Sequence, residues 1–322
     1  MQYLIKRLPY LFCIIILLNI IAGCSGNTGT KDTAVPAAYS ITDSQGYTID
    51  FAAKPRRIVS FSISTDEILL DMLPSDRIAA VSSLADDPGI SNVVQKAKEV
   101  PSRVPRNSNA EAVLALNPDL IIIPDFVDAN VIQSLRDLNL NVYVYKTPFT
   151  VEEVKNCIRE MAKLTGDPQN ADKLLAYMDT RLEQVQQKLG QLPPEQQKRV
   201  AFMRDNGVYY SNKTSFHDVF KNSGLYDITS DIENRPDGLL SQEEIVRLKP
   251  DIFIMADWNY DGKHDPDDLK NTILSNEAYT DIPAWQNKNI IMINGSRIFS
   301  LSQYMADAIL ELAQKAYPEK FN

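Results

Sequence analysis

The feature of this sequence that most limits its fold is an internal repeat. Residues 109–126 read NAEAVLALNPDLIIIPDF and residues 241–258 read SQEEIVRLKPDIFIMADW, at the same offset throughout. Each copy has the pattern of a helix, a turn and a buried strand, because apolar residues at helical spacing lead through a Pro-Asp pair into a continuous apolar run. The copies lie on either side of a long helical segment, and they therefore predict two similar lobes.

Strand-like and helix-like segments alternate around the first copy. The strand-like runs are residues 57–61, 77–82, 119–123 and 141–145, and the helix-like segments are 65–72, 110–116 and 130–138. This alternation predicts an α/β fold with mostly parallel sheets. A short hairpin is expected over residues 39–51, where alternating residues flank a Ser-Gln-Gly turn.

The longest periodic segment is residues 168–189, which predicts a helix of about 33 Å at 1.5 Å per residue. Asp167 precedes it as a candidate N-cap, and Gly190 follows its end. The segment separates an N-terminal α/β lobe at residues 39–166 from a C-terminal α/β lobe at residues 191–322, with the linking helix taken as 167–190. Ligands of such sheets bind beyond the carboxyl ends of the strands, so a ligand cleft is expected between the lobes.

The N-terminus has the pattern of an export signal. Lys6 and Arg7 precede an apolar stretch at residues 8–22, which is too short for a membrane-spanning helix. Small residues then precede Cys24, and this arrangement resembles the bacterial lipobox, in which the cysteine is lipidated and becomes the new N-terminus. An ordinary cleaved signal and an uncleaved anchor are the alternatives.

The lipobox interpretation predicts a signal peptide at residues 1–23. Residues 24–38 are rich in serine, glycine, threonine and alanine, which is typical of a flexible tether. The protein would then be anchored by lipid to a cell membrane, on the extracytoplasmic side, either in the periplasm or at the external face.

The charge balance and the missing motifs exclude several function classes. The 42 acidic and 33 basic residues leave a net charge of −9, which argues against nucleic acid binding. His217 and His264 are too few for a three-histidine zinc site, and the sequence has no CxxC, GxxxxGK or GxSxG motif. An enzyme would need a nucleophile beside a base. We therefore expect neither catalysis nor a resident cofactor.

Several segments, taken together, resemble a known family. They are residues 55–60 (PRRIVS), 65–69 (TDEIL), 86–88 (DDP) and the two copies of the repeat. In order and spacing they are similar to the substrate-binding proteins of ABC importers for ferric siderophores and vitamin B12, over about residues 45–316. The resemblance implies two Rossmann-like lobes joined by one long rigid helix.

The same resemblance implies a function. A monomer of this family would capture a metal chelate and deliver it to an ABC permease with its ATPase subunits. The chelate could be cobalamin, a ferric siderophore or haem, and the sequence does not choose among them. The alternatives are capture of a free metal ion, for which the histidines are few, and a sensor or adhesin that keeps the fold without transport.

Glu111 and Glu243 occupy matching places in the two copies of the repeat. On spacing alone, each carboxylate suits the dipole of its helix. The resemblance implies instead that one glutamate of each lobe docks onto arginines of the permease, and a pair of like features matches a two-fold symmetric partner. Glu244 either shares this role or closes a capping box with Ser241.

The candidate ligand-binding residues lie just past predicted strand ends. They are Ser62, Ile63, Ser64, Thr65, Asp86, Asp87, Asp125, Phe126, Tyr145 and Lys146 in the first lobe and Arg204, Tyr209, Tyr210, Trp258, Tyr260, Arg297 and Phe299 in the second. Tryptophan offers a large flat contact and arginine a fork for anionic oxygens. The alternative interpretation is that these residues only form turns and cap helices, as residues at such positions commonly do.

One acidic loop fits the start of a calcium-binding loop. Its candidate ligands are Asp257, Asn259, Asp261 and Asp268. Position twelve holds an aspartate where a bidentate glutamate is expected, and a strand precedes the loop instead of a helix. An exposed acidic loop is therefore the competing interpretation.

Overall fold

A computed structural model describes residues 38–104, 108–204, 207–211, 214–232, 238–258 and 265–322. The described residues belong to one compact unit, residues 37–322. The predicted signal peptide and Cys24 lie outside the described residues. Among the helices that are described, none combines the length and the apolar character that crossing a bilayer requires.

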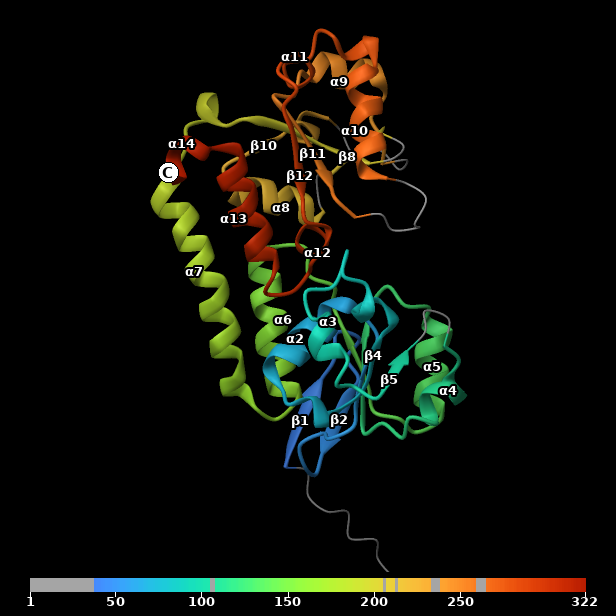
Figure 1. Ribbon diagram of the computed structural model, residues 1–322. Coiled ribbons are helices and arrows are strands. Elements are labelled where there is room, and N and C mark those ends of the chain that lie inside the picture. The colour runs from blue at the N-terminus through green and yellow to red at the C-terminus, as the bar shows by residue number, and fades with distance from the viewer. Residues whose placement is uncertain (1–37, 105–107, 205–206, 212–213, 233–237, 259–264) are drawn as a thin grey trace, which may run out of the picture. The chain divides into compact units, whose positions relative to one another are not determined.

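The first lobe, which we call the N lobe, is built on a five-stranded parallel sheet (Figure 1). Its strands, in the spatial order β5-β4-β3-β6-β7, are Ser102–Val104, Ile78–Ser82, Ile58–Ser60, Leu120–Pro124 and Val142–Tyr145. All five residues of β6 are buried, because helices cover both faces of a parallel sheet. The helices of this lobe are α2 Ile63–Met72, α3 Val94–Ala97, α4 Ala110–Leu114 and α5 Ala129–Asp137.

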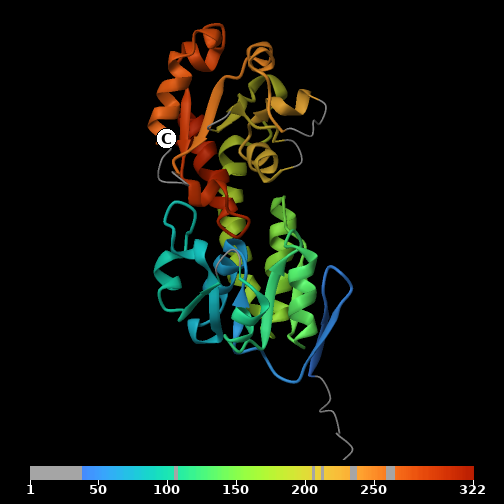
Figure 2. The ribbon, with the colours of Figure 1, turned by 90° about the vertical axis from the view of Figure 1, so that its right-hand side faces the viewer.

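The predicted hairpin is present as β1 Tyr39–Thr42 and β2 Thr48–Phe51, which pair in antiparallel register. Its turn includes Gly46 at φ 84°, a left-handed conformation that favours glycine. Ser44 donates from its amide to the carbonyl of Val144 at 3.0 Å, which attaches the hairpin to the edge strand β7. Figure 2 shows the hairpin in blue at this edge of the N lobe.

Two long helices follow the N lobe sheet. They are α6 Val151–Leu164, which Thr150 and Glu153 close with a capping box, and α7 Ala171–Leu189. Helix α7 packs against α2 and α6 of the N lobe and against α13 (Met305–Ala316) of the second lobe (Figure 1). One helix therefore contacts both lobes along its length.

The predicted start of the helical segment is confirmed in position: Asp167 is the N-cap residue of a short 3-10 helix, Pro168–Asn170, which leads directly into α7 at Ala171. The side chain of Asp167, however, makes no capping hydrogen bond. Its carboxylate instead forms ion pairs with Lys54 and with Arg77, whose Nη1 lies 2.5 Å from Oδ2. The side chain of Arg77 is nearly buried. Leaving its charge without a partner would be costly, which explains why the Asp167 carboxylate pairs with it.

The second lobe, the C lobe, has a second sheet. Its parallel strands, in the spatial order β10-β8-β11-β12, are Tyr226–Asp227, Arg199–Arg204, Ile252–Ala256 and Ile290–Ile293, and β9 Gly207–Val208 pairs with β8 in antiparallel direction. Its helices are α8 Ser215–Asn222, α9 Gln242–Leu248, α10 Pro266–Ser275, α11 Pro283–Gln286, α12 Gly295–Ile298, α13 and α14 Pro318–Phe321. The prediction of an α/β fold with parallel sheets and two lobes is confirmed.

The repeat corresponds to the same local structure in both lobes. Asp119 accepts from the amide of Arg57, and Asp251 accepts from the amide of Arg199, at 2.9 and 2.8 Å. Each of these arginines also donates to carbonyls at the end of the repeat helix. The Asp of each Pro-Asp pair thus ties its turn to the start of a neighbouring strand, β3 in the N lobe and β8 in the C lobe.

Candidate functional site

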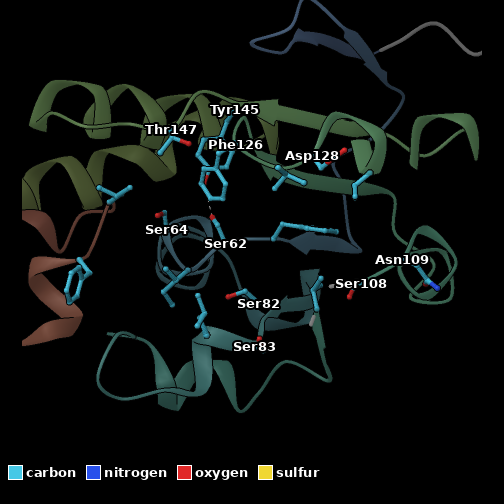
Figure 3. A pocket seen from close by; sticks show the side chains of 18 residues that line it. Ser62, Ser64, Ser82, Ser83, Ser108, Asn109, Phe126, Asp128, Tyr145 and Thr147 are labelled. Carbon is cyan, nitrogen blue, oxygen red and sulfur yellow. Dashed lines mark hydrogen bonds between the residues drawn. The ribbon is translucent and has the colours of Figure 1, made fainter. Parts of the chain in front are cut away.

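A pocket of about 810 Å³ lies at the carboxyl ends of the N lobe strands (Figure 3). It is lined by Phe61, Ser62, Ile63, Ser64, Ser82, Ser83, Leu84, Val104, Ser108, Asn109, Phe126, Val127, Asp128, Val131, Tyr145, Thr147, Phe299 and Leu301. The position is the one that parallel α/β sheets use for ligands. All of the lining residues come from the N lobe except Phe299 and Leu301, which follow α12 of the C lobe.

A chain of hydroxyl groups forms one part of the pocket wall. Ser62 caps α2, and its Oγ lies 2.8 Å from the hydroxyl of Tyr145 and 2.9 Å from Oγ1 of Thr65. Thr65 continues the chain to Ser60 at 2.7 Å. Burial raises the pKa of Tyr145 well above its ordinary value, so this phenol stays neutral. Thr65 is fully buried behind the wall and does not line the pocket.

Phe126 is an exposed aromatic residue of the pocket lining. Its side chain is 72% exposed, the highest value among the large hydrophobic residues that are exposed in the described chain. In Figure 3 Phe126 and Tyr145 lie on one side of the pocket, and Ser82 and Ser83 lie on the other. An aromatic ring that is exposed to water at a pocket can bury its apolar surface against a ligand.

The described lining of the pocket carries almost no charge. Asp128 is its one ionisable carboxylate, and Oδ1 of this residue already accepts from the amide of Asn130 at the start of α5, at 2.7 Å. No lysine, arginine or histidine is among the described residues that line it. The described part of the lining therefore offers mainly hydroxyl groups and apolar side chains to a ligand.

Asp125 and Asp257, which match each other in the repeat, hold neighbouring loops in place. Oδ1 of Asp125 accepts from the amide and the hydroxyl of Thr147 at 3.1 and 2.6 Å, just after β7. Oδ1 of Asp257 accepts from the amide of Gly295 at 2.7 Å, just after β12. Neither residue lines the pocket, and each fixes the loop after the adjacent strand.

Trp258 lies at a contact between the lobes, outside the pocket lining. Its Nε1 donates to Oδ2 of Asp87 in the N lobe at 3.1 Å, and its ring meets Phe299 edge-on with centroids 5.6 Å apart. Gly89 and Gly295 make the close approach possible, because a Cβ at Gly89 would lie 2.0 Å from Cδ1 of the indole. Trp258 follows the end of β11, as the sequence predicted, but its ring lies against Asp87 and Phe299 and does not line the pocket.

Substituting Gly89 by alanine should displace the indole of Trp258. The added methyl group cannot occupy the ring's position, so the hydrogen bond to Asp87 should break and the ring should move into water. The chain has two tryptophans. In a Trp285→Phe background we therefore expect a red shift of the remaining tryptophan emission and easier quenching by iodide. Asp87→Asn keeps an acceptor and serves as control; an unshifted Gly89→Ala emission would contradict this contact.

Among the other predicted residues of the C lobe, Phe299 lines the pocket and Tyr260 lies outside the described residues. Arg204, Tyr209, Tyr210 and Arg297 do not line it, and neither do Asp86, Asp87 and Lys146 of the N lobe. The guanidinium of Arg204 lies over the ring of Tyr209, 4.9 Å from its centroid. The hydroxyl of Tyr210 donates to the carbonyl of Ile232 at 2.9 Å. Arg297 pairs with Glu311 of α13 at 2.7 Å, in a separate polar groove between α7 and α13.

The predicted calcium loop is only partly described. Asn259 and Asp261 lie outside the described residues. Asp268 belongs to the first turn of α10, whose N-cap is Asp265, and Asp257 accepts from Gly295 as stated above. Within the described part of the chain, no three His, Cys, Asp or Glu side chains come together as a metal site would require.

The structure places both repeat glutamates on exposed helix starts. Glu111 is in the first turn of α4 and Glu243 in the first turn of α9, and both side chains are exposed. Neither carboxylate has a hydrogen bond or ion pair to a described residue. Glu244 closes the predicted capping box with Ser241, so this part of the expectation is confirmed.

Sequence reasoning missed several lining residues. Ser82 and Val104 are the last residues of β4 and β5, and Ser83 and Thr147 come just after β4 and β7, so the strand-end rule could have found them. Leu301 comes from a loop of the other lobe, and no local pattern indicates it. Its neighbour Phe299, which was predicted, does reach the pocket.

Known proteins resemble this chain over nearly its whole length. The ABC transporter substrate-binding lipoprotein YvrC of Bacillus subtilis is 21% identical, over 98% of this chain and 99% of the relative. A vitamin B12-binding protein of Vibrio campbellii is 23% identical, over 82% of this chain and 90% of its own. These relatives are named for binding and transport and not for an enzymatic activity.

A solved structure and a family match agree with the fold described above. The periplasmic heme-binding protein RhuT from Roseiflexus sp. RS-1 superposes with a TM-score of 0.67 at 20% identity, over 82% of this chain and 99% of its own. The periplasmic binding protein family matches residues 58–296, which include both sheets and the helix between them. The chain therefore belongs to the periplasmic binding protein family.

Proposed function

We propose that this protein is the extracytoplasmic binding component of an ABC importer, anchored by lipid at Cys24, that captures a metal chelate and delivers it to the permease. The observation that carries the proposal is the pocket of about 810 Å³ at the carboxyl ends of the N lobe strands. A bare metal ion needs a few ligand atoms about 2 Å away, and this pocket is far larger than that. Its apolar and hydroxyl lining suits an organic ligand.

Among chelates, the charge of the pocket favours cobalamin. Cobalamin presents mainly amides and methyl groups, which hydroxyls and aromatic rings can contact. Ferric catecholate siderophores carry a net negative charge, and these siderophores and the propionates of haem call for basic partners. The described lining of the pocket offers none. The names of the vitamin B12-binding relatives support the same choice.

Haem is disfavoured for a second reason. A haem-binding site commonly supplies an axial histidine or tyrosinate ligand. Tyr145 is the tyrosine that lines the pocket, and its hydroxyl is hydrogen-bonded to Ser62 with a raised pKa. Deprotonating this buried phenol to bind iron would be costly.

Delivery requires a docking surface, and we assign it to Glu111 and Glu243 together with the helix starts that carry them. Both carboxylates are exposed at equivalent positions of the repeated unit. Two equivalent acidic points on one monomer can each meet a basic residue of one subunit of a two-fold permease. The ATPase subunits would then act on the permease and not on this protein.

The proposal is tested by native mass spectrometry of residues 25–322, which contain the whole compact unit. The probes are cyanocobalamin, two ferric siderophores, haem, and zinc and manganese ions. We expect one tight 1:1 adduct with cyanocobalamin. A tight adduct with a siderophore or haem would move the choice of chelate, and binding of the bare ions alone would overturn the chelate proposal.

Phe126→Ala should weaken binding of cyanocobalamin by about 10- to 30-fold. A bound ligand would bury this ring, and truncating an aromatic side chain that is buried in a complex commonly costs about 2 kcal/mol of binding free energy. The matched control is Phe149→Ala, because Phe149 is another exposed phenylalanine of the N lobe, outside the pocket lining. Equal effects of the two substitutions on the Kd from titration calorimetry would argue against binding in this pocket.

A further inference from the structure

Glu67, in the middle of α2, is a fully buried carboxylate that contacts both lobes. Its Oε1 accepts from the amide and from Nδ2 of Asn92 in the N lobe, at 2.9 and 2.7 Å. Its Oε2 accepts from the hydroxyls of Ser300 and Ser302 in the C lobe, at 2.8 and 2.6 Å. Four donors therefore converge on one side chain, and two of them cross between the lobes.

The C lobe partners alternate with the residues that line the pocket. Phe299 and Leu301 line the pocket, whereas Ser300 and Ser302 are buried and point to Glu67. Phe299 has helical backbone angles, φ −91° and ψ −2°, so these opposite directions are shown by the contacts of the four residues and not by a strand pattern. Holding the two serines therefore holds the two apolar residues against the pocket.

A second connection fixes the other end of the same segment. Nδ2 of Asn92, besides donating to Glu67, donates to the carbonyl of Ser296 at 2.6 Å. The hydroxyl of Ser296 donates back to Oδ1 of Asn92 at 2.8 Å. Gln303 adds a bond from its Nε2 to the carbonyl oxygen of Glu67 at 3.1 Å. The segment from Ser296 to Gln303 is thus tied to Glu67 along its length.

The charged and titratable groups near Glu67 do not provide an ion pair. Asp66 is its neighbour on α2. Asp71, also on α2, forms an ion pair with Lys96 and accepts hydrogen bonds from Gln303 and Tyr304. Lys96 therefore pairs with Asp71 and not with Glu67. Among the described residues, the partners of the Glu67 carboxylate are hydroxyl, amide and backbone N–H donors. Such an arrangement specifies geometry because each donor has a fixed direction.

We propose that Glu67 is a positioning residue that sets where the C lobe wall of the pocket, Phe299 and Leu301, lies against the N lobe. Glu67 does not line the pocket, so it acts on a ligand through this wall. The positional role stands on the contacts above, and its consequence for ligand affinity rests on the proposed function. The width of the pocket is then decided by hydrogen bonds beneath it.

Hydrogen exchange of the ligand-free protein, residues 25–322, followed by mass spectrometry, tests the positional role. Glu67→Ala should speed exchange of the amides at 296–304 by about tenfold or more, since two hydrogen bonds to a buried acceptor are lost across the lobes. Glu67→Gln should restore slow exchange. Its amide oxygen can accept from Asn92, and its NH₂ group can donate to the hydroxyls of Ser300 and Ser302, which can act as acceptors. The double variant Ser300→Ala/Ser302→Ala should reproduce the fast exchange without altering α2.

Asp66→Ala is the matched control, since Asp66 is equally buried on the same helix and its hydrogen bonds go to Ser82 of its own lobe. It should leave exchange at 296–304 unchanged. The proposal is overturned if Glu67→Ala and the double serine variant leave this segment at the wild-type rate. It is equally overturned if Glu67→Ala speeds exchange by the same factor throughout both lobes.

The binding arm uses cyanocobalamin as probe. We expect Glu67→Ala to weaken its binding by about tenfold and Glu67→Gln to restore it, which global destabilisation alone would not produce. If Glu67→Ala shows faster hydrogen exchange at 296–304 but binds cyanocobalamin with wild-type affinity, the proposed effect of Glu67 on ligand binding is wrong. If the wild-type protein does not bind cyanocobalamin, the chelate assignment fails, and the exchange experiment still decides the positional role.

Discussion

A protein carrying both Glu111→Lys and Glu243→Lys should fold and bind its ligand normally and yet fail to support uptake. Both side chains are exposed and have no partner among the described residues, so the substitutions should cost little stability. If each carboxylate meets a basic residue of the permease, reversing its charge replaces an attraction by a repulsion. A loss of about 2–5 kcal/mol for each such pair would reduce productive docking by far more than a hundredfold.

The measurement is uptake of labelled ligand by cells that carry the variant as their only copy of this protein. Purified variant protein should keep its Tm and its ligand affinity. Asp137→Lys/Glu277→Lys is the matched control, because it changes the charge equally, with one exposed carboxylate on each lobe outside the repeat helices. Normal uptake by the Glu111/Glu243 variant would show that the protein does not dock through these two residues. It would also favour the alternative that the protein is a sensor or adhesin.

Lowering the pH from 8 to about 5 should make the protein more stable. Burial raises the pKa of both Asp66 and Glu67 to about 7, although hydrogen bonds from neighbouring side chains oppose the shift. In the unfolded chain such carboxyls titrate near about 4. Between these values the folded state binds more protons than the unfolded state, so the free energy of unfolding falls as the pH rises from about 4 to about 7.

The expected result is a Tm about 5 °C or more higher at pH 5 than at pH 8, measured by calorimetry at constant ionic strength. Below about pH 4 the trend should reverse. Asp167 and Glu311 are partly buried, which raises their pKa values, but bonds to basic side chains outweigh this and hold both below the ordinary range. The stability that these two residues contribute is lost as they become protonated.

Asp66→Asn/Glu67→Gln provides the control for this pH dependence, because neither amide titrates. The double variant should show a nearly flat Tm between pH 5 and pH 8. A wild-type Tm that rises steadily from pH 5 to pH 8 would show that both groups stay ionised in the folded protein. The assignment of the pH dependence to this buried pair would then be wrong.

Much of the fold could be predicted because it depends on local patterns. The repeat at residues 109–126 and 241–258 predicted one helix, turn and strand in each lobe, and the structure has α4 with β6 and α9 with β11 there. Even the turn conformation recurs, with Asn117 at φ 49° and Lys249 at φ 46°. Apolar periodicity and capping residues act within a few positions of one another, so a sequence displays them directly.

The candidate site could be predicted only where the chain stays near a strand end. Ser62, Ser64, Phe126 and Tyr145 line the pocket, as expected for residues that follow parallel strands. The arginine at 297 was expected at the same kind of place, but the short helix α12 turns it toward Glu311. The direction of a side chain after a strand depends on the loop that carries it and on the partners that the loop meets.

The α/β class, the two lobes and the long helix could all be predicted from the sequence, because they follow from periodicity and turn residues. The sheet edge at which we expect the ligand follows from the rule that parallel strands end at one edge. Which side chains close the pocket, by contrast, depends on contacts between distant parts of the chain. Glu67 meets Ser300 across 233 residues of chain, and a contact at that separation leaves no trace in local pattern, because folding of both lobes brings its partners together.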